Sequence, residues 1–214
     1  MHRFFFATKD AFINSGSNQI TGEDWLDKNT GQDEIIELKK VFWNRDFHYP
    51  TRLLIKFDAD EIENFISSSN VYTKDPSYKT NLKLWETKGT SGLSETYTIA
   101  AYPVSESWNE GVGKESDEPK TTDGVSWKNR QYPAGGAEVA WATGGGSYIA
   151  SDEVTQSFSA ESPDINMDVT SIAKKWFGGT NNNYGLLLRF SGSRETSTGS
   201  FEDLKFFSRQ TNTI

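Results

Sequence analysis

Apolar side chains recur at every second position in several short stretches of the chain, a spacing typical of β-strands with one buried face. In the stretch 51–58, Leu53, Ile55 and Phe57 fall on one side of an extended backbone, and only Leu54 interrupts the alternation. These three residues are therefore expected to form part of the core. The same pattern, or a β-branched and aromatic run between turn residues, predicts strands at 3–13, 34–43, 81–86, 97–104, 139–142, 155–159, 184–190 and 204–208.

Two short helices are expected among these strands. Asp60, with Glu63 three residues later, resembles a capping box ahead of apolar positions 62, 65 and 66. The second helix is predicted to have Asp168 as its N-cap, to carry Trp176 on its apolar stripe, and to stop at Gly178. Asp168 and Trp176 thus receive structural roles, the first as a cap and the second as a plug at one end of the fold.

The predominance of strands indicates an all-β protein, a two-layer antiparallel β-sandwich of jelly-roll type with one or two short helices. The 214 residues suit a single sandwich domain, 1–214. The absence of cysteine leaves its stability to burial of the core. Two segments rich in Gly, Ser, Thr and charge, 109–124 and 191–200, are predicted to be long loops, which often serve as contact surfaces.

The charge distribution argues against nucleic acid and membrane as partners. The chain has 22 Lys and Arg against 30 Asp and Glu, a net charge of −8, and no basic block that would neutralise phosphates. No apolar run approaches the roughly 20 residues needed to cross a bilayer. The apolar patch at 4–7 is too short for the hydrophobic region of a signal peptide, so synthesis in the cytoplasm is expected.

Catalytic chemistry has little support in the residues. The two histidines are His2, near the terminus, and His48, in an aromatic turn where packing is the better interpretation. The glycine run 144–146 has no lysine for a phosphate, so turn geometry explains it. Paired carboxylates could support glycoside hydrolysis, but abundant acids alone do not indicate it. We therefore predict that the protein is not an enzyme.

Asp164, Asn166 and Asp168 would project from one side of an extended segment, where their oxygens could bind calcium. A surface cluster of acids is common, however, and Asp168 already has a predicted capping role. We expect no cofactor, with a structural calcium at these three residues as the alternative.

Three tryptophans raise the possibility of a glycan-binding surface. The flat indoles of Trp108, Trp127 and Trp141 suit the apolar faces of pyranose rings. Burial competes with this interpretation, because a sandwich has two inner faces to fill and indoles bury large areas.

The order of segments along the chain resembles that of a known family. The stretches that carry the resemblance are 7–13, 51–58, 104–111, 124–127, 141–145, 167–170, 176, 183–188 and 206–209. Together they are similar to the DNRLRE-type β-sandwich modules, which resemble carbohydrate-binding jelly rolls, and most of all to the version found in structural proteins of tailed phages. The match extends over nearly the whole chain, and Arg52–Leu53 is the nearest remnant of the signature that names the family.

The resemblance implies a structural component of a bacteriophage virion, in the tail, baseplate, fibre, neck or capsid decoration. Its expected partners are other virion proteins or copies of itself, and its expected location is the particle. The alternative is a carbohydrate-binding module that recognises host or other surface glycan. In the relatives a further strand follows the equivalent of 206–209, so either the chain is truncated or an edge is left open for another subunit.

Overall fold

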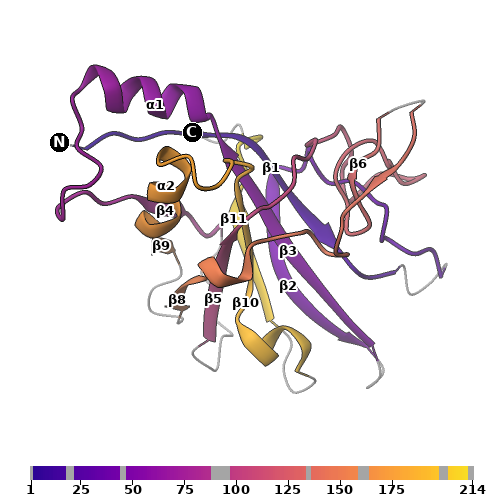
Figure 1. Cartoon of the computed structure of the whole chain (residues 1–214). Helices are drawn as coiled ribbons and strands as arrows, with labels where there is room; N and C mark the ends of the chain where they lie inside the picture. The colour runs from indigo at the N-terminus through magenta and orange to yellow at the C-terminus, as the bar shows by residue number, and fades with distance from the viewer. Residues whose placement is uncertain are drawn as a thin grey trace.

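A computed structural model shows a mostly β protein in which two helices accompany the strands (Figure 1). It describes residues 2–17, 22–43, 47–87, 97–133, 136–158, 164–197 and 202–211. The strands are β1 (Ala7–Asn14), β2 (Ile35–Trp43), β3 (Phe47–Phe57), β4 (Asn81–Leu84), β5 (Tyr97–Pro103), β6 (Asn129–Gln131), β7 (Val139–Ala140), β8 (Val154–Phe158), β9 (Ile165–Asp168), β10 (Leu186–Phe190) and β11 (Glu202–Phe207). The helices are α1 (Ala59–Ser68) and α2 (Thr170–Phe177), with 3-10 turns η1 (Ala150–Asp152) and η2 (Gly192–Thr196).

The strands form two antiparallel layers that share the long strand β3. The first layer has the order β1-β3-β10-β5-β8. The start of β3 pairs instead with β2, which continues into β11. A bridge between Glu86 and Phe206 then joins β11 to the chain after β4, and β4 pairs with β9. The predicted all-β sandwich is therefore confirmed, and the predicted strands match observed ones to within a few residues, whereas β6 and β9 were not predicted.

The main core lies between the two layers. Leu53 and Ile55 from β3 are buried there, and Phe57 packs at its margin, half-buried. Leu204 and Phe206 from β11 meet them from the second layer. The indole of Trp176 on α2 packs against the same cluster. Leu53 and Ile55 are thus core residues, whereas Phe57, which was also expected in the core, is only half-buried at its margin.

A second core covers the outer face of the first layer, which the sequence pattern did not predict. Leu54 and Leu187 are completely buried on this face. The chain between β5 and β8 folds over them and contributes Trp108, Val125 and Trp141. Leu54, an exception to the alternation in the sequence, is therefore a core residue of the opposite face.

The segment 109–124 is folded onto the body through Asn29, which is completely buried. The Asn29 side-chain amide donates to the carbonyls of Glu110 and Val125, both at 2.7 Å. Its carbonyl oxygen accepts from the backbone N–H of Gly31 at 3.2 Å and of Gly113 at 2.8 Å. One asparagine thereby fixes both ends of the segment.

Both helices differ from prediction at their N-termini. The N-cap of α1 is Asp58, two residues before the predicted Asp60, and its carboxylate accepts from the N–H of Asp60 at 2.9 Å and of Glu61 at 3.2 Å. The N-cap of α2 is Val169. Asp168, predicted to be the N-cap, is the residue before it. Its carboxylate still accepts from the N–H of Thr170, the first residue of the helix, at 2.9 Å.

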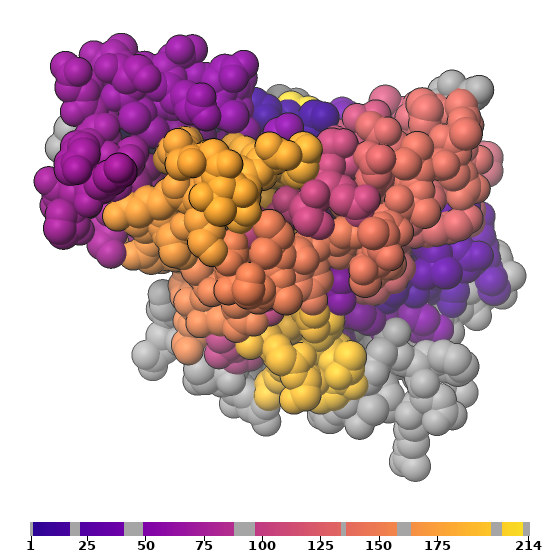
Figure 2. All heavy atoms as spheres, in the orientation of Figure 1, coloured from indigo at the N-terminus to yellow at the C-terminus, as the bar shows by residue number. Residues whose placement is uncertain are grey.

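The N-terminal strap, residues 2–6, runs in extended form beneath α1 (Figure 1). Phe5 points toward α1, where its ring lies 5.6 Å from that of Phe65 in an edge-to-face arrangement. Phe4 and Phe6 are exposed on the other side of the strap. In the space-filling view, α1 and the chain that follows it form one corner of the molecule, with α2 packed below them (Figure 2).

The strand near the C-terminus is not the open edge considered from the sequence. β11 pairs with β2 on one side, and on the other side the N–H of Phe207 donates to the carbonyl of Trp85 at 3.1 Å. The free side of β1 is also covered, because its N–H groups at Asp10 and Phe12 donate to the side chains of Glu110 and Thr30. A strand of another subunit could pair with β11 or β1 only by displacing the groups that already form hydrogen bonds there.

Candidate functional site

Two of the three tryptophans proposed for glycan binding are core residues. Trp108 is 3% exposed and Trp141 is 5% exposed. Their indole N–H groups donate to the carbonyls of Tyr184 at 2.8 Å and Ser126 at 2.9 Å. With both indoles covered, neither offers a ring face to a sugar, so this part of the glycan hypothesis was wrong for these two residues.

Trp127 is partly exposed, and the guanidinium of Arg52 lies over its ring, 4.8 Å from the centroid. The glycine turn beside it has Gly145 at φ +83° and Gly146 at φ +92°, which agrees with the turn interpretation of this run. A Cβ on Gly145 would come within 2.7 Å of the Trp127 ring. Trp127 is thus packed between an arginine and a tight turn.

The three residues proposed for calcium lie along the outer face of β9 and the residue before it, and each already has a partner. Asp164 accepts from the N–H of Glu86 at 2.9 Å, and Asn166 accepts from the Asn81 amide at 3.2 Å. Asp168 accepts from the Lys79 ammonium at 3.0 Å. Because a strand rises about 3.3 Å per residue, Asp164 and Asp168 lie roughly 13 Å apart along it, too far to share one ion.

Hydrogen bonds from Thr170 and Lys79 hold the pKa of Asp168 at about 2, which suits a hydrogen-bonded carboxylate with a structural role. Among the residues the structure describes, no three His, Cys, Asp or Glu side chains gather as a metal site. In those same residues, no helix has the length and apolar character needed to cross a membrane.

A buried charge cluster lies on the outer face of the first layer, and the sequence did not reveal it. Arg52 donates from Nε and Nη2 to the two carboxylate oxygens of Glu195, at 2.8 and 3.0 Å, and from Nη1 to the carbonyl of Gly145 at 2.7 Å. Arg189 forms a second ion pair with Glu195 and donates to the Tyr148 hydroxyl at 2.8 Å. Glu195, from the segment 191–200 predicted to be a loop, is only 2% exposed.

Two acidic residues, Asp10 and Glu110, also lie close together, because the N–H of Asp10 donates to the Glu110 carboxylate at 2.8 Å. Burial raises the pKa of Asp10 to about 6. Both carboxylates bind the chain after β11: Asp10 accepts from the N–H of Arg209 at 2.7 Å, and Glu110 accepts from its guanidinium Nε, also at 2.7 Å. The pair thus binds residue 209, and we assign it a structural role.

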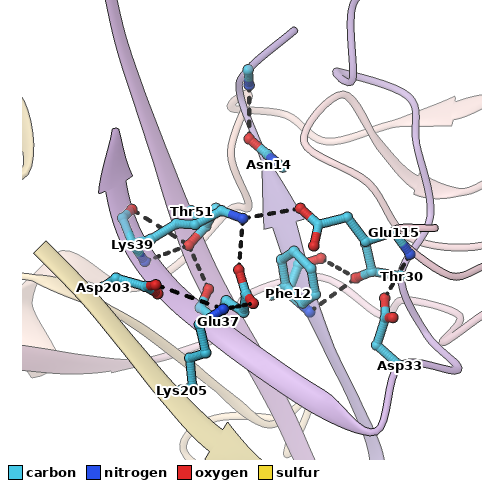
Figure 3. A network of polar contacts seen from close by, with 11 residues as sticks. Phe12, Asn14, Thr30, Asp33, Glu37, Lys39, Thr51, Glu115, Asp203 and Lys205 are labelled. Carbon is cyan, nitrogen blue, oxygen red and sulfur yellow. Dashed lines mark hydrogen bonds and ion pairs between the residues drawn. The ribbon is translucent and has the colours of Figure 1, made fainter. Parts of the chain in front are cut away.

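The outer face of the second layer carries a network of opposite charges (Figure 3). Glu37 on β2 accepts from the Lys39 and Lys205 ammonium groups, each at 2.6 Å, and Lys39 also donates to Glu115 at 2.9 Å. Burial alone would raise the pKa of Glu37, but the two ammonium groups outweigh it and the pKa lies below its usual value. Nearby, burial raises the pKa of Asp33 to about 6.

Beside this network lies the aromatic strip, which we define as Phe4, Trp85 and Phe207. Their exposed fractions are 62%, 53% and 40%. Trp85 and Phe207 are opposite one another on neighbouring chain segments, and the Lys83 ammonium lies 5.8 Å from the centroid of the Phe4 ring. The strip was not identified from the sequence, although alternation with the buried residues Leu82 and Leu84 indicates that Trp85 faces outward.

The strip departs from an ordinary surface, because large aromatic side chains are normally buried. Two of its three rings are held side by side, because Trp85 directly follows β4, Phe207 ends β11, and the N–H of Phe207 donates to the carbonyl of Trp85. Neither the protein-family models nor the curated proteins searched contain a match to this chain.

Proposed function

We propose that this chain is a structural component of a bacteriophage particle and acts through contacts with other particle proteins or with copies of itself, without catalysing a reaction. The single observation that carries the proposal is the aromatic strip on the outer face of the second layer. Exposed aromatic side chains with a polar rim are typical of protein–protein contacts. The order of segments that resembles tailed-phage structural modules supports the same role.

The internal architecture is consistent with a module built for contact. The first layer is buried on both faces, and the segment 109–124 is bonded to Asn29. A rigid body of this kind can present a surface without a large ordering cost on binding. The proposed location is therefore the virion, with the strip as the contact surface.

Mass spectrometry of purified particles tests this proposal. Protein from the chain should be present in particles separated on a density gradient, at a ratio to the major capsid protein that stays constant across the particle fractions. Its absence from particles, or its removal by a salt wash that leaves the particles intact, would show that the role is not structural.

Carbohydrate binding is a second candidate, and the side chain that favours it is Trp85 instead of the tryptophans singled out from the sequence. Trp85, rather than Trp108 or Trp141, presents an accessible indole. A glycan array that compares the native protein with Trp85→Ala tests this candidate, with loss of binding in the variant as the expected result.

A further inference from the structure

We propose that the aromatic strip is the contact surface for a second copy of this chain, arranged around a two-fold axis. The inference rests on the proposed structural role and deepens it by naming the surface and the partner. Three observations support it: the exposure of the rings, the charge balance of the face that carries them, and the pairing of Trp85 with Phe207.

The exposure of the strip favours a binding partner. Trp85 and Phe207 belong to a sheet whose inner side chains, Leu84 and Phe206, are buried in the main core. Their own rings point to the opposite side, where the described chain leaves them 53% and 40% exposed. Covering such rings removes apolar area from water, which is the main favourable term in association.

The charge of this face selects the kind of partner. The charged side chains described on this face are Lys39, Lys79, Lys83 and Lys205 against Glu37, Glu115, Asp164, Asp168 and Asp203, so the face carries a net charge of −1. The whole chain carries −8. Two copies would repel one another across most of their surface, but they can bring this nearly balanced face together with little net repulsion.

The same balance argues against other partners. Nucleic acid or an anionic lipid surface would require a net positive face. A sugar could stack on the indole of Trp85, but the Lys83 ammonium lies over the ring of Phe4, so the strip does not offer a continuous row of open ring faces. The face therefore suits a protein surface on which charges of both signs also alternate. The same face of a second copy is such a surface.

The pairing of Trp85 with Phe207 explains why a two-fold axis is proposed. A contact of this symmetry uses the same patch on both subunits, so that residue i meets residue j and residue j meets residue i. Because the two rings are adjacent across neighbouring segments, rotation by half a turn brings Trp85 of one copy over Phe207 of the other. Lys83 and Lys205, each two residues before one of the rings, would form the polar rim together with Asp203 farther along β11.

Sedimentation equilibrium of the full chain over a wide concentration range is the first test. The native protein should form dimers, and Trp85→Ala should raise the dissociation constant about tenfold or more, since truncation of a central aromatic typically costs more than about 1 kcal/mol. Leu26→Ala removes a side chain of similar exposure, 37%, outside the strip and should leave dimerisation unchanged. Circular dichroism verifies that each variant is folded.

Complementary charges provide a sharper second test. Phe207→Glu and Phe207→Lys should each be monomeric alone, whereas an equimolar mixture should dimerise again, because the two-fold axis places each introduced charge near its opposite. A monomeric native protein, or dimers that Trp85→Ala leaves unchanged, overturns the proposed contact. So does a monomer that binds glycan through Trp85.

The particle measurement separates this inference from the proposed function. A monomeric protein that is nevertheless present in purified particles overturns the two-fold contact alone. A dimer that is absent from particles overturns the structural role alone.

Discussion

Arg52 and Glu195 are 143 residues apart in the sequence, yet they meet through two parallel hydrogen bonds of 2.8 and 3.0 Å. Their side chains are 10% and 3% exposed, and Arg189 binds the same carboxylate from β10. One carboxylate therefore binds two guanidinium groups beside the second core, and it connects β3 and β10 to η2.

Glu195→Gln is expected to lower the free energy of unfolding by about 3 kcal/mol or more. The substitution keeps the shape but removes the charge, and breaking a buried ion pair from one side leaves the other charge uncompensated. Urea unfolding followed by tryptophan fluorescence measures the effect. Glu138→Gln breaks the exposed pair with Lys128 and should leave the unfolding midpoint unchanged. If both variants lost the same unfolding free energy, the pair of Arg52 and Glu195 would have to be as accessible to water as the exposed pair of Lys128 and Glu138.

Asn29→Asp should detach the segment 109–124 from the body. The amide that donates to the carbonyls of Glu110 and Val125 would be replaced by an oxygen with no proton to donate, leaving buried acceptors unsatisfied. A loss of about 2–4 kcal/mol is expected for two such groups. Limited proteolysis should then cut within 109–124 in the variant but not in the native protein. Asn182→Asp, at an exposed position, is the control, and unchanged proteolysis would contradict the assignment.

The sequence predicted most strands because one buried face produces a period of two. Leu53 and Ile55 follow it, and both lie in the main core. The second core was missed because it makes a strand apolar on both faces, which removes the alternation. The uninterrupted run Leu186–Leu188 is the signal that could have revealed it, since such a run is typical of a strand buried on both sides.

The polar contacts could not be predicted in the same way. Nothing local in the sequence connects Arg52 with Glu195, and Asn29 resembles an ordinary turn residue. The tryptophans show the same limit: Trp108 and Trp85 are both followed by polar residues, but tertiary contacts cover the first and leave the second exposed. The sequence signal that separates the two tryptophans is the alternation with Leu82 and Leu84, which indicates that the side chain of Trp85 points outward.

Gly111→Ala is expected to destabilise the protein more than Gly179→Ala. Both glycines have positive φ, +89° and +69°, so both variants incur left-handed strain of about 1–2 kcal/mol. A Cβ on Gly111 would also lie 2.1 Å from the carbonyl oxygen of Asp123 and 2.4 Å from the Asn29 side chain, whereas nothing lies within 4 Å at Gly179. Thermal unfolding compares the two. Equal midpoints would show that the 109–124 segment yields to the added methyl group.

Stability is expected to fall as the pH rises from about 4 to 7, because burial raises the pKa of Asp10 and of Asp33 from 3.8 to about 6. A carboxyl group with a raised pKa in the folded state binds its proton more tightly there than in the unfolded chain. Its stabilising contribution is therefore complete below pH 3.8 and is lost as the pH passes through 6. Asp168 acts in the opposite direction, but only below pH 4, since its pKa is lowered to about 2.

Asp10→Asn separates the contribution of Asp10 from the others. The amide oxygen can still accept from the N–H of Arg209, but it no longer ionises, so the decline in unfolding free energy between pH 4 and 7 should become shallower by about 2–3 kcal/mol. Urea midpoints measured at each pH provide the slope for both proteins. Asp75→Asn changes an exposed carboxylate and should keep the native slope. If Asp10→Asn also kept it, the buried carboxyl group would have to be ionised throughout this range, with Arg209 compensating its burial.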